Sequence, residues 1–267
     1  MTTVTAFRGG RALFVLLWLV GLGVIASVAA GLIPGGLIVA AGVALALCIT
    51  IAIGVMSQRC GFFARPLIRV AGVSDRLALT FDDGPDPEFT PRLLELLRQT
   101  GQRATFFVIG SRVAQHPELA RRIVLEGHEL GNHTLDHRWH MALWSARRIA
   151  WELRRTSDLI ETHTGQRPVL VRPPAAILSP RIEAGCRAAG LRLVGFSTRS
   201  LDGSPAIPAR QVLARLLRGL TPGAILVLHD AAVAGKPPHS IEVLPRLCEE
   251  MAARGLRSVP LSELLKG

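Results

Sequence analysis

A long uncharged stretch near the N-terminus constrains this chain more than any other feature. Residues 12–58 contain no Asp, Glu, Lys, Arg or His, and a Pro-Gly-Gly sequence at 34–36 divides them. The two apolar segments on either side are residues 12–33 and 37–56. Each is long enough to cross a hydrocarbon core about 30 Å thick, which takes about 20 apolar residues. The sequence therefore predicts a two-helix transmembrane hairpin.

A cleaved secretory signal is the alternative interpretation of the first segment. Arg8 and Arg11 precede an apolar run that ends in small residues at 26–30, which is typical of a cleavage region. Cleavage there would leave a new N-terminus outside the cell, and the second segment would still carry the chain back. Both interpretations therefore place the downstream residues on the same side of the membrane.

Basic residues on both flanks of the hairpin predict its orientation. Arg8 and Arg11 precede the first segment, and Arg59, Arg65 and Arg69 follow the second. Because positively charged flanks stay in the cytoplasm, we expect a multi-pass protein of the bacterial inner (cytoplasmic) membrane. The hairpin would occupy residues 1–58, and a catalytic domain at 59–267 would face the cytoplasm.

The net charge of +11 belongs mostly to the downstream domain, because only Arg8 and Arg11 precede residue 57 and 11 − 2 leaves +9. Attraction to anionic lipid headgroups, at about 1 kcal/mol per basic residue near the surface, explains this charge as well as a solvated basic face does. A membrane-tethered nucleic-acid binder is a weaker alternative. No helix-turn-helix, zinc-finger or RNA-recognition pattern accompanies the charge, so we expect no nucleic-acid partner.

The four cysteines show no C-x-x-C spacing, so they indicate neither a zinc knuckle nor a disulfide framework. Beyond the hairpin, short β-rich runs alternate with helical patterns. The expected strands are 76–81, 104–109, 128–131, 168–172, 191–196, 224–228 and 256–259. The expected helices are 91–100, 117–127, 143–163, 180–189, 208–219 and 240–254, with Thr90 and His116 preceding prolines at the first helical positions. Regular alternation predicts an α/β fold with a parallel sheet, either open or closed into a barrel.

Unusual polar residues follow several of the expected strands, where parallel α/β folds place their chemistry. Asp82 and Asp83 directly follow the strand at 76–81 and precede Gly84-Pro85. Neighbouring residues that leave a strand project in different directions, so one carboxylate could bind a metal while the other faces substrate or water. An Asp-Asp-Gly-Pro sequence alone is more often just a turn.

His133 and His137 form the second polar cluster. If they begin a helix, their i, i+4 spacing places both imidazoles on one face, within reach of one ion. Taken singly, each would more often be a surface or hydrogen-bonded histidine. Two histidines and one carboxylate, with a further position left to water or substrate, form the pattern of a catalytic zinc site.

Three further strand ends carry Arg172, Asp202 and His229. A histidine directly after a buried strand is a reasonable general acid or base, because its unperturbed pKa near 6.5 is adjustable by a nearby carboxylate. A structural ion pair between Arg172 and Asp202 is the alternative for those two residues.

The order of these motifs resembles the polysaccharide deacetylases of carbohydrate esterase family four, the NodB-homology domain. The matching motifs are TFDDGP at 80–85, HTLDH at 133–137, RPP at 172–174, the isolated Asp202, and LVLHD at 226–230. The resemblance spans about residues 76–260. It implies a distorted (β/α) barrel of about seven strands, here preceded by the transmembrane hairpin.

The resemblance also implies a metal-dependent carbohydrate N-deacetylase, a hydrolase acting on linear amide C–N bonds. Asp83, His133 and His137 match the metal ligands of the family. The metal would be a divalent cation, most often zinc, with cobalt, nickel or manganese as alternatives. The substrate would be an N-acylated amino sugar.

Four residues match the family's acid and base machinery. Asp82 corresponds to the general base and Arg172 to the residue that orients it. His229 corresponds to the general acid, and Asp202 to the carboxylate that tunes the acid. The roles inferred from the residues themselves agree with these correspondences.

The chain departs from the family pattern around the substrate. Ala175 and Ala176 stand where the family usually has an aromatic residue and a glycine, although the Ala175 backbone N–H could still serve as an oxyanion donor. Gly203 replaces a tryptophan, and Val227 replaces the leucine that lines the acetate pocket. Since the chain has no tyrosine, we expect a groove without aromatic platforms, ill suited to stacking a long glycan.

The cytoplasmic orientation and the groove without aromatic platforms predict a lipid-linked substrate, such as a polyprenyl-phosphate hexosamine, and the membrane as a partner. The resemblance extends to relatives of the lipid A modification type, which implies the same substrate class. One alternative is an extracytoplasmic deacetylase of peptidoglycan, chitin-like or exopolysaccharide chains. An alternative of another class is an inactive carbohydrate-binding pseudoenzyme. The sequence leaves the oligomeric state open.

Overall fold

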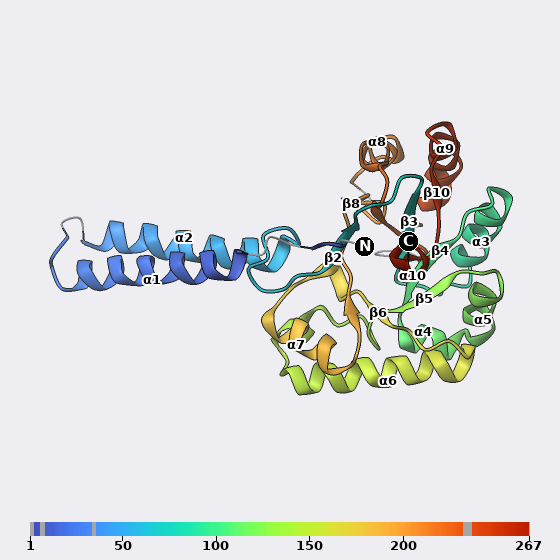
Figure 1. Ribbon diagram of the computed structural model, residues 1–267. Coiled ribbons are helices and arrows are strands. Elements are labelled where there is room, and N and C mark those ends of the chain that lie inside the picture. The colour runs from blue at the N-terminus through green and yellow to red at the C-terminus, as the bar shows by residue number, and fades with distance from the viewer. Residues whose placement is uncertain (1–2, 6–8, 34–35, 205, 232–236, 267) are drawn as a thin grey trace.

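Two long apolar helices project away from the body of the protein (Figure 1). The computed structural model describes residues 3–5, 9–33, 36–204, 206–231 and 237–266. The helices are α1 (Gly10–Ala29) and α2 (Gly36–Met56), with mean hydropathies of 2.6 and 2.7, and both are long and apolar enough to cross a membrane. Arg8, Pro34 and Gly35, used above to predict the hairpin, lie outside the described residues.

The two helices contact each other along their length and are exposed elsewhere. Trp18 donates its indole N–H to Thr50 Oγ1 at 3.0 Å, and Gly21 leaves room for the side chain of Leu47. Only 6% and 11% of the most apolar windows are buried. Apolar side chains without protein partners are typical of a surface that faces lipid rather than water.

Both ends of the hairpin return to the same domain. Strand β1 (Thr3–Thr5), which precedes the two helices in the sequence, pairs antiparallel with β2 (Leu67–Val70), which follows them. At the start of α1, Arg11 forms an ion pair with Glu183 and Phe14 contacts the ring of Phe63, with centroids 4.9 Å apart. The hairpin is therefore attached to the domain by strand pairing, an ion pair and aromatic packing.

Eight strands of the described chain form one parallel sheet, in the order β7-β6-β5-β4-β3-β9-β8, with β10 paired to the start of β3. The strands are β3 (Arg76–Asp82), β4 (Ala104–Val108), β5 (Glu129–Asn132), β6 (Leu170–Val171), β7 (Arg192–Leu193), β8 (Thr198–Arg199), β9 (Ile225–His229) and β10 (Arg257–Ser258). Because the central strands are covered on both faces, they consist of nearly unbroken apolar residues.

The sheet curls until its two edges approach β2. Bridges join Leu67 of β2 to Val194 just after β7, and Arg69 of β2 to Ala224 just before β9. Strand β2 thus lies between the edge at β7 and the strands on the other side of the opening. This arrangement confirms the predicted distorted (β/α) barrel of about seven strands.

Helices surround the curled sheet (Figure 1). They are α3 (Phe89–Gln99), α4 (Gly110–Gln115), α5 (Pro117–Leu125), α6 (Ala146–Thr164), α7 (Pro180–Ala188), α8 (Ala209–Gly219), α9 (Ser240–Ala253) and α10 (Leu261–Lys266), with short 3-10 turns η1 (Trp139–Leu143) and η2 (Pro174–Ala176). The largest buried cluster joins β3, β4 and β9 to α3, α8 and α9, and includes the stacked rings of Phe81 and Phe106. Burial of such rings contributes roughly 1.5–3 kcal/mol each.

The predicted helix starts were right at one position and wrong at another. His116 precedes α5, whose first residue is Pro117, as expected. Helix α3 begins at Phe89 rather than after Thr90, so Thr90 is not its N-cap. The Thr90 hydroxyl is buried instead, where it accepts the Asp86 N–H at 2.8 Å and donates to Asp230 Oδ2 at 2.7 Å.

Candidate active site

Parallel pairing brings the ends of β3 and β9 together. Asp82, the last residue of β3, lies in register with His229, the last residue of β9. Asp83 follows with φ of 80°, so the backbone turns sharply and the two adjacent carboxylates point in different directions. A non-glycine residue in this conformation is strained and needs support from its surroundings.

Asp230 supplies part of that support from beneath the turn. It is fully buried, and its backbone N–H donates to the carbonyl of Asp82 at 3.2 Å. A Cβ on Gly84 would lie 2.0 Å from Asp230 Oδ2, so only glycine fits over this carboxyl. Burial, and to a lesser degree the charge of Asp83, raise the pKa of Asp230 to about 7.

Arg172, at the end of β6, fixes Asp82. Its fully buried guanidinium donates from Nη1 to Asp82 Oδ1 at 2.7 Å and to Thr80 Oγ1 at 2.8 Å, and from Nη2 to the Gly195 carbonyl at 2.8 Å. Its central carbon lies 4.2 Å from the centroid of the Phe107 ring. These contacts hold one Asp82 oxygen, and they keep a cation next to a carboxylate that is only 6% exposed.

His133 and His137 follow β5 on a loop, so the condition that they begin a helix is not met. Asn132 Oδ1 accepts the Thr134 N–H at 2.9 Å, and Thr134 Oγ1 accepts the His137 N–H at 3.2 Å. These side chain to backbone hydrogen bonds compete with helix formation. Thr134 and His137 have φ of 69° and 55°, and this loop geometry rather than helical spacing brings both imidazoles to one side.

Three donor atoms converge on one point. Nε2 of His133 and Nε2 of His137 each lie 3.2 Å from Asp83 Oδ1. Within the described chain that buried oxygen has no hydrogen bond. Burial by itself would raise the pKa of Asp83, but the close contact with His133 and the charges of the neighbouring imidazoles hold it well below its usual range.

The tautomer of His133 is consistent with metal binding. Its Nδ1 lies 2.7 Å from the Arg172 carbonyl, so Nδ1 carries the proton and donates it, and the lone pair of Nε2 faces Asp83. Such a backbone contact commonly orients a histidine that ligates a metal. Two imidazole nitrogens, one otherwise unpaired carboxylate oxygen and open positions fit a divalent cation of the zinc or cobalt type.

Asp202 orients His229 through both of its carboxylate oxygens. Its Oδ1 lies 2.7 Å from His229 Nδ1 and also accepts the Ser200 hydroxyl at 2.6 Å, while its Oδ2 accepts the His229 N–H at 2.8 Å. Desolvation alone would lower the pKa of His229, but Asp202 outweighs it and raises that pKa to about 9. The alternative ion pair between Arg172 and Asp202 is therefore wrong, since each has a different partner.

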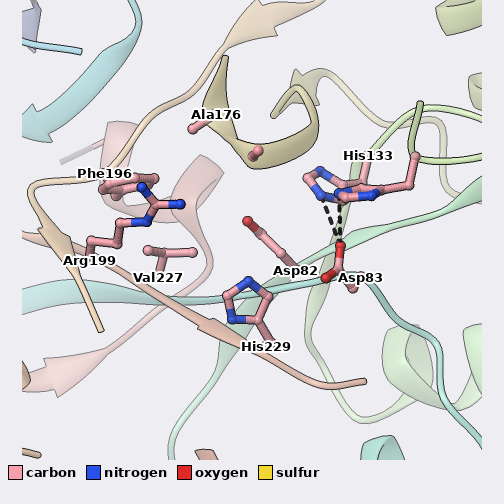
Figure 2. Close-up of a pocket in the computed structure, with 10 residues that line it drawn as sticks. Asp82, Asp83, His133, Ala176, Phe196, Arg199, Val227 and His229 are labelled. Atoms are coloured by element: carbon pink, nitrogen blue, oxygen red, sulfur yellow. Dashed lines mark ion pairs between the residues drawn. The ribbon is translucent and has the colours of Figure 1, made fainter. Parts of the chain in front are cut away.

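The two adjacent carboxylates and the three histidines face one cavity of about 190 Å³ (Figure 2). Asp82 and the Asp83, His133 and His137 cluster line it, and His229 lies across from them. The other lining residues are Ala175, Ala176, Phe196, Arg199 and Val227. The predicted oxyanion donor Ala175 and its neighbour have φ of 52° and 54°, so the η2 segment bends over the cavity.

The sequence interpretation missed Phe196 and Arg199. The expected groove without aromatic platforms was wrong in this respect, because the Phe196 ring forms part of the wall. Arg199 lies beside it in Figure 2, with its guanidinium carbon 6.0 Å from the ring centroid. Phe196 ends the expected strand 191–196, so its position at the same edge as the other site residues was the signal that could have found it.

Comparisons with known proteins agree with this geometry. The sequence model of the polysaccharide deacetylase family matches residues 70–194. A peptidoglycan-N-acetylglucosamine deacetylase of Bacillus cereus is 32% identical, over 71% of this chain and 88% of the relative. A chitooligosaccharide deacetylase of Bradyrhizobium is 34% identical, over 70% of this chain and 89% of the relative.

A solved structure extends the comparison to three dimensions. It is a family 4 acetyl xylan esterase from Clostridium thermocellum in complex with a cobalt ion, and it superposes with a TM-score of 0.66 at 34% identity. The superposition covers 72% of this chain and 91% of the esterase.

Proposed function

This chain belongs to the polysaccharide deacetylase family and is a carbohydrate deacetylase, and we propose that it hydrolyses the N-acetyl amide of an amino sugar. One observation carries the proposal: a carboxylate, a three-donor cluster and a histidine with a raised pKa face the same cavity. A base, an electrophile site and an acid around one space are what amide hydrolysis requires.

Asp83, His133 and His137 would hold the divalent cation. When bound, the cation polarises the amide carbonyl and lowers the pKa of the attacking water. Ala175 and Val227 line the space around the acetyl group. The bent η2 segment places the backbone of Ala175 at the cavity wall, where its N–H serves as an oxyanion donor.

Asp82 takes the proton from the attacking water, and His229 delivers a proton to the leaving amine. Arg172 fixes one oxygen of Asp82 with a charge-assisted hydrogen bond, so the other oxygen is left for the water. His229 is a cation at neutral pH because its pKa is raised to about 9, so it carries the proton it must donate. The products are acetate and the free amine, and exchange with solvent returns both side chains to their starting states.

Replacing Asp82 tests this assignment and the pseudoenzyme alternative together. With an N-acetylglucosamine oligomer as substrate, Asp82→Asn should lower acetate release by at least a hundredfold, since general base catalysis contributes about 10²–10⁴. Metal content measured on the same preparation should stay at the wild-type level, whereas Asp83→Asn should lose the metal. Equal acetate release by wild type and Asp82→Asn would contradict the assigned base. No release by wild type from any N-acetyl sugar would favour the pseudoenzyme.

The relatives' substrates support an N-acetylglucosamine unit of a glycan as the first candidate. A second candidate, a lipid-linked amino sugar with a phosphate next to the sugar, is favoured by Arg199. This arginine lines the cavity, and among the described residues no carboxylate pairs with it. Its guanidinium is suited to bind a phosphate oxygen.

Arg199→Gln separates the two candidates. It should raise the KM for a polyprenyl-phosphate-linked N-acetylhexosamine while leaving the KM for a neutral N-acetylglucosamine oligomer unchanged. Equal effects on both substrates, or no activity with the phosphate-linked one, would contradict the second candidate. Arg181→Gln is the control, because Arg181 is exposed and bonds only the Leu143 carbonyl.

We further propose that residues 1–58 form a membrane hairpin and 59–267 the catalytic domain, with the domain in the cytoplasm. The basic residues Arg11, Arg59, Arg65 and Arg69 at the base of the hairpin support this orientation. A C-terminal fusion to a reporter that is active only outside the cytoplasm should be inactive. An active fusion would place the domain outside the cytoplasm, where glycan polymers are the accessible substrates.

A further inference from the structure

Residues at the C-terminal end of α2 and just after it form hydrogen bonds to the two loops that carry the cavity wall. The carbonyl of Val55 accepts the Leu178 N–H at 3.0 Å, on the segment that follows Ala175 and Ala176. Gln58 Oε1 accepts the Phe196 N–H at 2.9 Å. Arg59 donates to the carbonyl of Ser197 at 3.1 Å, next to Phe196. The hairpin end therefore contacts the same two loops from which the wall residues project.

Gln58 is the most enclosed of these contacts. It is only 7% exposed although it follows a helix that is largely free of protein contacts. A Cβ on Gly195 would lie 2.0 Å from Gln58 Oε1, so a side chain at this position would displace the Gln58 amide. The carbonyl of Gly195 in turn accepts a hydrogen bond from Arg172. Gln58 thus packs against a peptide that also contacts the buried guanidinium.

These contacts lie outside the segment that matches the family. The family match begins at residue 70, whereas Val55, Gln58 and Arg59 precede it. The catalytic motifs therefore do not account for them.

We propose that Gln58 is a positioning residue that holds the Phe196 wall in place for substrate binding. The end of the membrane hairpin is then part of the substrate-binding wall and does more than anchor the domain. Without the Gln58 acceptor, the Phe196 N–H loses its partner and the loop gains freedom, which weakens the wall against the sugar. The hydrogen bonds that hold Asp82 to Arg172 and His229 to Asp202 do not involve Gln58, so the loss falls on binding rather than on proton transfer.

Gln58→Met tests the proposal in the full chain purified in detergent, because methionine keeps the length of the side chain and removes the acceptor. Losing one buried hydrogen bond should raise KM on the order of tenfold with kcat little changed. Gln58→Glu retains a side-chain oxygen and should recover most of the lost affinity. Gln99→Met is the matched control, since Gln99 is exposed and bonds only Glu95.

Hydrogen exchange supplies a readout that does not need an active enzyme or a known substrate. In Gln58→Met the amides around Phe196 should exchange on the order of tenfold faster, while those of β3 and β9 stay protected. The proposed function assigns the reaction measured by KM, but its failure would leave the exchange result unaffected.

The outcomes separate clearly. Faster exchange confined to residues 195–199, together with the KM increase and recovery by Gln58→Glu, supports the positioning role. Exchange identical to that of Gln99→Met overturns it. A general loss of thermal stability and metal content, with exchange faster throughout the domain, also overturns it and assigns Gln58 a purely structural role.

Discussion

Asp202→Asn should convert His229 from an acid that stays protonated through neutral and mildly alkaline pH into one that loses its proton in mildly alkaline solution. Asp202 is buried and holds His229 through both its carboxylate oxygens. Its negative charge is the principal cause of the raised pKa of His229, against the desolvation that would otherwise lower it. Asparagine preserves an acceptor for the backbone N–H but removes the charge, so the imidazolium loses its counter-ion.

The size of the effect follows from the two pKa values. With a pKa of about 9, wild-type His229 is about 90% protonated at pH 8. Without Asp202 the pKa returns to about 6.5 or lower, because burial still disfavours the cation, and about 3% remains protonated at pH 8. The variant should therefore lose about 30-fold in kcat/KM at pH 8, yet less than about twofold at pH 6.

The assay is acetate release from an N-acetylglucosamine oligomer across pH 5.5 to 9.5 with metal in excess. The alkaline limb of kcat/KM should move to lower pH in Asp202→Asn. Asp158→Asn is the control, because Asp158 pairs with Arg167 at the surface and should leave the profile unchanged. A loss of the same size at every pH would refute the reasoning, since it would mean that His229 does not titrate as the acid.

Arg172→Met should reduce the free energy of unfolding by about 3–5 kcal/mol, because it leaves Asp82 as an unpaired buried carboxylate. Denaturant unfolding followed by tryptophan fluorescence measures this, with the exposed Arg218→Met as control, and equal midpoints for the two variants would contradict it. Treatment with a chelator should abolish acetate release and restoring zinc or cobalt should recover it, because Asp83, His133 and His137 bring three donors together. Turnover that persists after metal content has fallen to background would exclude the assigned metal role.

The architecture followed from the sequence where local and long-range signals agree. Strands β3, β4 and β9 are buried on both faces, so their apolar runs could be recognised in the sequence alone. Strands β7 and β8, of two residues each, were harder to predict, because such short strands owe their conformation to neighbours in the sheet. Strand β2 was missed because its partner β1 lies on the other side of two helices in the sequence, and its further bridges reach two other distant segments.

The site shows the same division. The five residues that follow strands and line one cavity are Asp82, Asp83, His133, His137 and His229. Arg172 and Asp202 contact Asp82 and His229, and the roles of all seven stay predictions. His133 and His137 lie on a loop rather than a helix because Asn132 and Thr134 bond the local backbone, which apolar periodicity does not report. The positions of Phe196 and Gln58 could not be predicted, because they depend on how a loop is placed and on a hydrogen bond between residues far apart in the sequence.

The pairing of β1 with β2 ties the order of folding to the order of synthesis. Strand β1 leaves the ribosome before either apolar helix, whereas its partner is made only after both. The first strand must therefore remain unpaired until both helices have been made. In the membrane arrangement proposed above, the ladder would close only if the two ends of the hairpin finish on the same side of the bilayer. In that arrangement a chain threaded with a single crossing would leave β1 without its partner, so completion of this small sheet would check that the helices have been inserted as a pair.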